Sequence, residues 1–313
     1  MPLNADKPTR WKADIAASVD QFNSWFLQFA PLEYRQTRSK TVALVREAMR
    51  ITANFADLSP ATLRANPGIL PTLRMATAPP LARDRLIGLA GVPAGLVTAM
   101  EAGRLPRQVS AEALGRLSAT IGRVLDRDLF PWIETPADQD EVGRDRAATV
   151  VADRLCGAMS DPIIRNAHEK RQVAVAQAFL EARGYRLQPP LGRPIREMEP
   201  GTFAFRLNVP VAREDETLVN MPIDIVIQPK GARVPAMPLL LEAKSAGDFA
   251  NTNKRRKEEA TKIAQLRRTY GEDVHLILFL CGYFDAGYLG YSAHEGLDFV
   301  WEHRVEDLIE LGV

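Results

Sequence analysis

Two short apolar segments decide how this chain can fold: Pro222-Ile223-Asp224-Ile225-Val226-Ile227 and Leu239-Leu240-Leu241-Glu242-Ala243-Lys244. Their β-branched and leucine side chains are typical of buried β-strands. Each segment nevertheless carries charge where burial is costly. Side chains alternate along a strand, so Glu242 and Lys244 point to one face, where both need partners or a metal ion.

Pairing of these two strands would place Asp224 beside Glu242. Two converging carboxylates form an oxygen site suited to Mg²⁺, and the main-chain carbonyl of Ala243 offers a further ligand. A bound metal ion would neutralise phosphate oxygens and lower the pKa of a water ligand. Lys244 would orient that water and stabilise the charge on a phosphorane. We therefore predict hydrolysis of a phosphodiester, with Asp224, Glu242 and Lys244 as catalytic residues and Asp224, Glu242 and Ala243 as metal ligands. The alternative, a surface ion pair on an edge strand, is disfavoured because both strands are so apolar.

The elements around these strands predict an α+β fold, in which helices flank a mixed sheet with an α/β core. Ser160-Asp161-Pro162 offers a helix cap and a first-turn proline, and Gly184 offers a stop, so a helix is expected over 161–183. The predicted order continues with strands at 202–209, 222–228 and 238–244, a helix at 252–270, strands at 274–280 and 299–301, and a helix at 305–311. The aromatic segment 283–291 is expected to be a packed turn or a dimer contact.

The first half of the chain predicts an all-helical domain. Apolar residues recur at helical spacing over 11–30 and 39–56, and prolines then divide the chain into short helices. The stretch 83–103 faintly resembles the helix-turn-helix of phage repressors, but its second helix offers mainly Thr98 and Glu101 to base edges, so a structural bundle is favoured. Residues 133–141 hold four acids and no base, which is typical of a linker. The expected domains are therefore 1–140 and 141–313.

Composition excludes several classes of protein. The chain has 313 residues with 40 Lys+Arg, 39 Asp+Glu and two cysteines. Two cysteines exclude a disulfide scaffold and a four-cysteine zinc site, and they favour a reducing, cytoplasmic setting. The absence of a membrane-length apolar run or a secretory signal agrees with that location. A net charge of +1 argues against a uniformly basic nucleic-acid binder, although it leaves open where the charges lie.

The charges are in fact unevenly distributed. Residues 244–268 contain eight bases and three acids, directly after Lys244. This excess predicts contact with DNA phosphates, and the candidate DNA-binding residues are Asn251, Asn253, Lys254, Arg255, Arg256 and Lys257. The alternative is a solvated helix face whose bases are balanced by Glu258 and Glu259.

The spacing of the charged residues also resembles a known nuclease signature. Asp224, followed after 17 residues by Glu242-Ala243-Lys244, resembles the PD-(D/E)xK motif, with the proline two residues before the aspartate. The predicted element order fits the core of that superfamily. Beyond it, Leu240-Leu241-Glu242-Ala243-Lys244-Ser245-Ala246-Gly247-Asp248 resembles the XamI family of Type II restriction endonucleases. The segments 162–172, 251–259, 279–291 and 301–304 resemble the same family, so the likeness is strongest over 150–313.

This resemblance implies Mg²⁺-dependent cleavage of double-stranded DNA at a short palindrome of the GTCGAC type by a homodimer. It also implies a restriction-modification system, in which a cognate DNA methyltransferase acts on the same site. In related nucleases an acid on the helix before the sheet completes the metal site. Glu169 is the candidate here, although it is equally an exposed charge beside Lys170 and Arg171. Two other functions stay open: a DNA-binding regulator with a silent nuclease-like domain, and a structure-specific repair nuclease.

Overall fold

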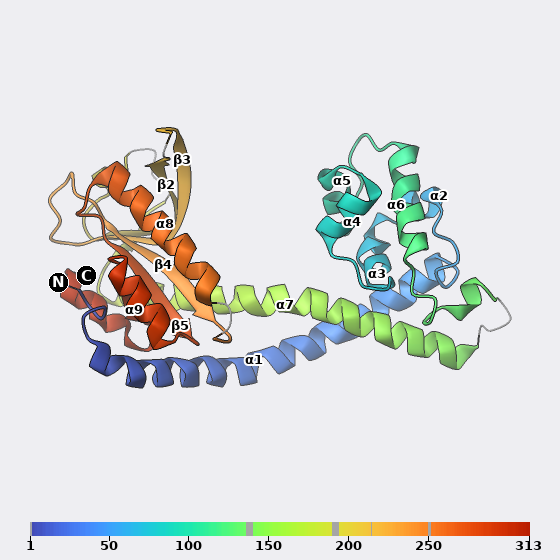
Figure 1. The fold of residues 1–313 in the computed structure, drawn as a ribbon, viewed down its shortest axis with the longest axis horizontal. Helices are drawn as coiled ribbons and strands as arrows, with labels where there is room; N and C mark the ends of the chain where they lie inside the picture. The colour runs from blue at the N-terminus through green and yellow to red at the C-terminus, as the bar shows by residue number, and fades with distance from the viewer. Residues whose placement is uncertain (1, 136–139, 190–193, 214, 250–251) are drawn as a thin grey trace. The chain divides into compact units, whose positions relative to one another are not determined.

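The computed structural model describes residues 2–135, 140–189, 194–213, 215–249 and 252–313, the side chains of 252–256 excepted. Contacts divide the chain into two compact units. Unit 1 combines Met1–Phe29 with Arg165–Val313, and unit 2 is Ala30–Ile164. Two long helices, α1 (Pro8–Ile51) and α7 (Glu141–Ala182), contribute residues to both units (Figure 1). The predicted boundary near residue 140 does not coincide with this division, and residues 136–139 of the predicted linker lie outside the described residues.

The predicted start of a helix at Ser160-Asp161-Pro162 is wrong, because α7 runs through Pro162 without a break. Ser160 does not cap a new helix: its Oγ donates to the Gly157 carbonyl in the preceding turn, at 3.5 Å. An internal proline removes one hydrogen bond, a loss that a helix of 42 residues tolerates. The predicted helices 11–30 and 39–56 belong to one helix, α1, which contains Pro31 and ends at Ile51, so residues 52–56 are turn rather than helix.

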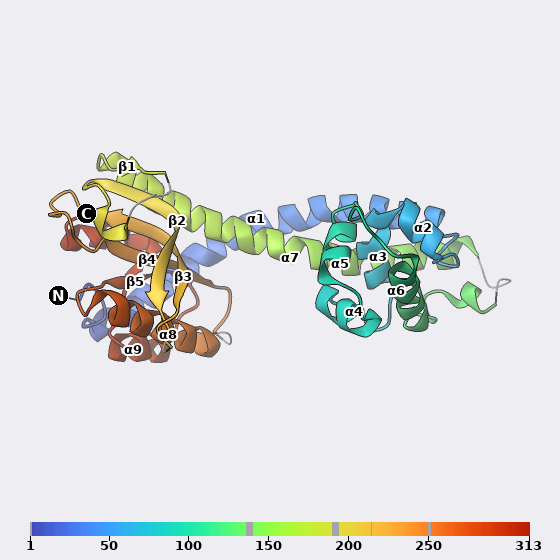
Figure 2. The same cartoon turned by 90° about the horizontal axis from the view of Figure 1, so that it is seen from above.

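Unit 2 contains only helices and turns apart from an isolated bridge between Thr77 and Leu125, within its described residues. Five short helices follow α1: α2 (Pro60–Ala65), α3 (Leu70–Met75), α4 (Arg83–Ala90), α5 (Ala94–Glu101) and α6 (Ala111–Arg123) (Figure 2). Two 3-10 turns, Pro67–Ile69 and Pro131–Ile133, complete it. The helices surround one apolar core, so the all-helical character predicted for this half of the chain is confirmed.

Among the described residues of unit 1, six strands form one mixed sheet, which confirms the predicted α+β class. The strands lie in the order β1-β2-β3-β4-β5-β6, and their bounds are Arg186–Leu187, Thr202–Ala212, Leu218–Gln228, Leu239–Ala246, Leu276–Gly282 and Asp298–Trp301. β2, β3 and β4 are antiparallel neighbours, whereas β4, β5 and β6 are parallel, as are β1 and β2. The predicted strands are all present.

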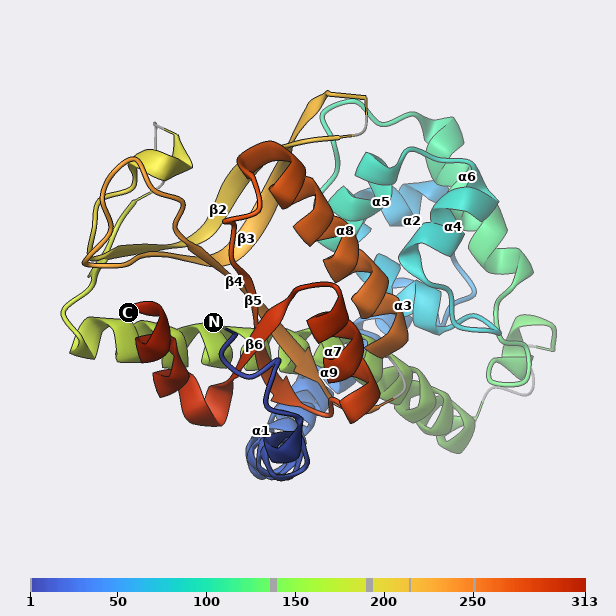
Figure 3. The same ribbon diagram turned by 60° about the vertical axis from the view of Figure 1, so that its left-hand side comes forward.

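Helices cover both faces of this sheet, which explains why all seven residues of β5 are buried (Figure 3). Leu278 and Leu280 pack in one cluster with Ile263 of α8 (Thr252–Tyr270) and residues of α9 (Ala286–His294). Phe279 packs on the other face with Leu180 of α7 and with the C-terminal 3-10 segment, Glu302–Leu311. The helix predicted at 305–311 is therefore present in 3-10 form.

Most of the segment 283–291 is helical, because α9 begins at Ala286, so the predicted packed turn is limited to residues 283–285 and the alternative of a dimer contact stays a prediction. Asp285 caps α9, since its Oδ1 accepts a hydrogen bond from the Tyr288 amide at 2.6 Å. Gly282 precedes the cap with a φ of +102°, and a Cβ there would lie 2.1 Å from the Ala246 carbonyl oxygen. The glycine therefore allows β5 to turn tightly against β4 before α9 begins. None of the described helices is both long and apolar enough to cross a membrane.

Candidate active site

Asp224 lies where the pairing of β3 is interrupted on both sides. Ile225–Ile227 pair with Leu239–Leu241 of β4, and this ladder ends at Ile225, the residue next to Asp224. On the other side the ladder with β2 skips the pair Asp224 and Arg206, because Arg206 has a φ of +50°. Such a break frees a strand residue for other contacts, and breaks of this kind are common beside functional sites.

The side chain of Asp224 makes the next contact with β4 itself. Its Oδ2 accepts a hydrogen bond from the Ala243 amide at 2.9 Å. This bond fixes Asp224 beside the Glu242-Ala243-Lys244 segment, as expected if the two strands pair. The N–H and C=O of a strand residue lie on the same edge, so the carbonyl of Ala243 is directed to the same side as Asp224.

Glu242 and Lys244 share one face of β4, as strand alternation predicts. Lys244 Nζ lies 3.1 Å from Glu242 Oε1, and Glu242 is 5% exposed. The same carboxylate oxygen accepts a hydrogen bond from Lys262 of α8. Two ammonium groups therefore converge on one oxygen of Glu242. The other oxygen, Oε2, is buried and has no hydrogen-bond partner among the described residues.

The sequence did not place two residues of α8, Glu259 and Lys262, at the site. Glu259 is 1% exposed, its Oε2 accepts from the Tyr288 hydroxyl at 2.5 Å, and its Oε1 lies 3.8 Å from Lys244 Nζ. The alternative interpretation of this helix as a solvated face, with Glu258 and Glu259 as balancing charges, does not hold for Glu259, which is buried, whereas Glu258 is exposed. A signal was present: Glu259 lies four residues before Ile263, on the apolar face of the helix.

The electrostatics of the site favour a cation. Burial raises the pKa of Asp224, and the negative charge of Glu242 raises it further; the Ala243 amide and the charges of Lys244 and Lys262 partly offset both effects. Three carboxylates (Asp224, Glu242 and Glu259) thus face two ammonium groups. The carboxylate oxygens, with the Ala243 carbonyl nearby, are hard donors of the kind that Mg²⁺ prefers.

Glu169 forms an ion pair with Arg206 rather than with any of the three predicted catalytic residues. Its Oε1 lies 2.8 Å from Arg206 Nη2, and the side chains are 42% and 73% exposed, respectively. The structure thus joins Glu169 to the residue opposite Asp224 in β2 and gives it an ion-pair partner of its own. Its described contacts do not bring it to Asp224, Glu242 and Lys244.

The predicted DNA-binding residues Asn253, Lys254, Arg255, Arg256 and Lys257 lie in the first turns of α8. Asn251 is outside the described residues, and Asn253, Lys254, Arg255 and Arg256 are described only as helical backbone. Lys257 is exposed. The helix that carries this basic run is therefore the helix that supplies Lys262 and Glu259 to the site.

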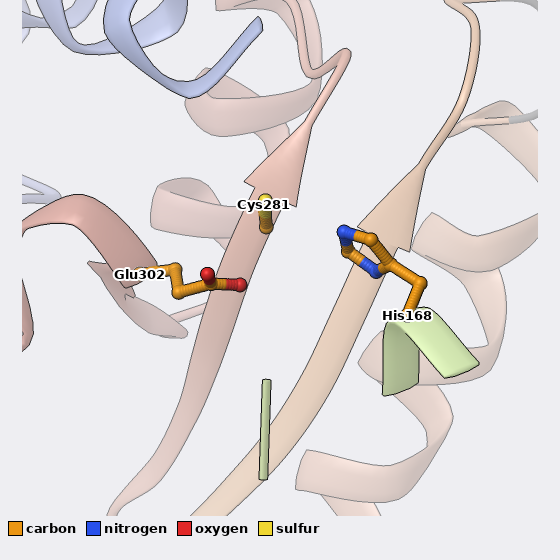
Figure 4. A group of neighbouring side chains, drawn as sticks. All are labelled: His168, Cys281 and Glu302. Atoms are coloured by element: carbon orange, nitrogen blue, oxygen red, sulfur yellow. The ribbon is translucent and has the colours of Figure 1, made fainter. Parts of the chain in front are cut away.

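A second buried group of polar side chains lies on the opposite face of the sheet. His168 of α7, Cys281 of β5 and Glu302 have ligand atoms that all lie within 4.8 Å of one another (Figure 4). Arg171 already supplies positive charge there: its Nη2 is 2.7 Å from Glu302 Oε1 and 3.5 Å from both Cys281 Sγ and His168 Nε2. Burial raises the pKa of both the Cys281 thiol and the Glu302 carboxyl. The geometry indicates a buried ion pair with two neutral neighbours.

This group predicts a loss of stability in mild acid. Burial and, secondarily, Arg171 lower the pKa of His168 to about 4. A histidine has a pKa of about 6.5 when unfolded, so the unfolded chain takes up a proton first and the stability present above pH 6.5 is lost as the pH falls. We expect His168 to account for about 2 kcal/mol of the decrease in unfolding free energy between pH 7 and pH 5.

Denaturant unfolding of His168→Gln at the two pH values measures this contribution, because glutamine does not titrate. The variant is expected to lose less stability on acidification than the parent chain. His294→Gln, at an exposed position, is the control and should retain the parent's pH dependence. An unchanged dependence in His168→Gln would contradict the burial of a neutral imidazole.

Comparison with known proteins bears on both units. The family model described as XamI restriction endonuclease matches residues 53–301. The Type II restriction enzyme SalI of Streptomyces albus G is 52% identical over 315 residues, which cover 99% of each chain. A solved structure, protein VC1899 from Vibrio cholerae, is 13% identical with a TM-score of 0.28, and the match covers 90% of this chain but only 56% of that one. The structural likeness is too weak to bear on the fold. The family model and the identity along almost the whole chain show that this protein belongs to the XamI family of restriction endonucleases.

Proposed function

We propose that this protein is a Type II restriction endonuclease that hydrolyses one phosphodiester in each strand of a DNA site, with Mg²⁺ as its cofactor. The observation that supports this most is the position of Asp224 at a break in two strand ladders, bonded to the Ala243 amide between Glu242 and Lys244. Asp224, Glu242 and Lys244 are the proposed catalytic residues.

The residues present fit a divalent metal ion. Glu242 Oε2 is buried without a hydrogen-bond partner among the described residues, and the raised pKa of Asp224 reflects a second carboxylate that burial makes costly to ionise. Asp224, Glu242 and the carbonyl of Ala243 would hold the ion. When bound, Mg²⁺ neutralises phosphate oxygens and acidifies a water ligand.

The chain's own groups prepare the site for that chemistry. The Ala243 amide orients Asp224, and Lys262 shares the neutralisation of Glu242, so Lys244 is not required for it. Lys244 can then orient the attacking water and donate to the oxygen that gains charge in the transition state. Glu259, held by the Tyr288 hydroxyl, lies close enough to steady the ammonium group of Lys244.

Membership of the family and the symmetry of a palindrome support a proposal for the substrate. A palindromic site presents the same scissile bond twice, and two copies of the chain related by a two-fold axis would cut both strands. We propose a homodimer that acts at a GTCGAC-type palindrome, with a cognate DNA methyltransferase that acts on the same sequence.

Digestion of a plasmid with one GTCGAC site tests the proposal. With Mg²⁺ we expect a single linear product, and with EDTA in place of Mg²⁺ we expect none. A matched plasmid with one base pair of the site changed is the specificity control and should remain circular. Equal cutting of both plasmids, or cutting only at ends and junctions, would contradict a restriction endonuclease of this specificity.

A further inference from the structure

The short helices of unit 2 carry an excess of positive charge. Residues 60–123 contain eight arginines, no lysine and three acids, an excess of five, although the whole chain has a net charge of only +1. The rest of the chain therefore has 32 bases and 36 acids. This local excess within a nearly neutral chain indicates a polyanionic partner for these short helices as well as for the active site.

The acids of this segment are already paired within it. Glu101 lies 2.5 Å from Arg74, Asp84 lies 3.6 Å from Arg83 and Glu112 lies 2.7 Å from Arg116. Five arginines are left over: Arg64, Arg85, Arg104, Arg107 and Arg123. All five are exposed, and none has an ion pair with a described residue. Their charge is therefore available to a ligand.

Three arginines of the segment line one pocket, which we call the arginine pocket. They are Arg64 of α2, Arg107 of the loop before α6, and Arg116 of α6, and they are joined by the polar side chains of Gln108 and Ser110. Arg64 is held by a hydrogen bond from its Nη2 to the Val109 carbonyl, at 3.2 Å. The pocket has no acidic lining residue among the described residues.

We propose that the arginine pocket binds the phosphodiester backbone of duplex DNA. The guanidinium group matches phosphate in both charge and geometry, and the arginine pocket brings three of them together in one concave site. The Arg116 pair with Glu112 does not compete strongly, because the Glu112 side chain is 79% exposed and such pairs are weak. The proposal rests on the proposed function, since DNA is the substrate of that reaction.

The neighbouring helices favour contact with the backbone over reading of bases. α4 and α5 are joined by the three-residue turn 91–93, in which Gly91 has a φ of +59°. α5 borders the arginine pocket, but the residues it exposes at Ala94, Gly95 and Thr98 are small, and only Thr98 carries a polar side chain. This surface offers few hydrogen-bonding groups to base edges, whereas its small residues let a phosphate approach the helix closely.

Binding of duplex DNA by the full-length chain tests the arginine pocket. The test variant combines Arg64→Gln, Arg107→Gln and Arg116→Gln. The probe is a fluorescent 20-base-pair duplex without GTCGAC, in EDTA, titrated at several salt concentrations. Each phosphate contact contributes about 0.9 to the slope of log K against log salt, so the variant is expected to lose a slope of about 2–3 and to bind about tenfold or more weakly at low salt.

The matched control replaces three arginines that line another pocket of unit 2: Arg46, Arg50 and Arg144. That pocket includes Asp145, and Arg46 and Arg50 have acidic partners in Asp145 and Glu47. The control is expected to keep the parent's slope. An unchanged slope in the test variant, or an equal loss in the control, would overturn the proposal. Thermal unfolding of both variants verifies that they are folded.

The binding titration and the plasmid digestion together separate this proposal from the proposed function. If the parent chain binds the duplex but never cleaves a plasmid, the endonuclease assignment fails. The slopes of log K against log salt still test whether the arginine pocket binds DNA. If the parent chain cleaves and the test variant binds like the parent, the arginine pocket alone is refuted.

Discussion

Replacing Glu242 by glutamine is expected to reduce the rate of DNA cleavage by about 10²–10³-fold or more, because the variant loses charge at the centre of the site. Glutamine preserves the shape of the side chain but removes its negative charge. Lys244 and Lys262 together neutralise that charge in the parent protein. It also places a donor where Glu242 has a buried acceptor without a described partner. Single-turnover cleavage with enzyme in excess measures the effect, and Asp224→Asn and Lys244→Met should behave alike.

The control for this prediction is Glu258→Gln, an exposed position on α8 next to the buried Glu259. It changes the net charge by the same amount and should cleave at the parent's rate. The Glu242 variant should still bind duplex DNA, since its defect lies in chemistry. Cleavage at the parent's rate by Glu242→Gln, or an equal loss in Glu258→Gln, would remove Glu242 from the active site.

The meeting of Asp224 and Glu242 was predictable because it depends on local rules. Strand alternation places Glu242 and Lys244 on one face, and antiparallel pairing of two adjacent strands brings Asp224 opposite Glu242. Neither rule requires knowledge of the rest of the molecule. The strand positions were predictable because they also depend on local patterns. A run that is apolar on both faces, such as β5, indicates a strand buried in the middle of a sheet.

The remaining parts of the site and fold depend on tertiary packing, which local patterns do not specify. Lys262 and Glu259 enter the site because α8 packs across the face of the sheet that carries Glu242, and a polar helix gives little indication of which face it buries. Similarly, Pro162 resembles a helix start in isolation, but α7 continues through it. A capping signal is overridden where packing on both sides stabilises a continuous helix.

Replacing Arg171 by methionine is expected to lower the free energy of unfolding by about 3–5 kcal/mol, because removal of one partner leaves a buried charge uncompensated. The Glu302 side chain is fully buried, and its Oε1 is bonded by Arg171 at 2.7 Å and by Gln21 at 3.0 Å. Methionine fills similar space without charge, so the cost reports the electrostatics more than a cavity. Denaturant unfolding at pH 7 measures it, with Arg165→Met, an exposed position on the same helix, as the control.

The double variant Arg171→Met with Glu302→Gln separates the two causes of that cost. If the penalty comes from an uncompensated carboxylate, removal of the charge from Glu302 as well should restore much of the lost stability, since a buried pair can often be replaced as a whole at little cost. If the penalty comes from lost packing, the second substitution should restore nothing. Even beside Arg171, burial raises the pKa of the Glu302 carboxyl, so ionising Glu302 is costly at this position. A double variant no more stable than Arg171→Met would therefore contradict an electrostatic role for Arg171 beneath the sheet.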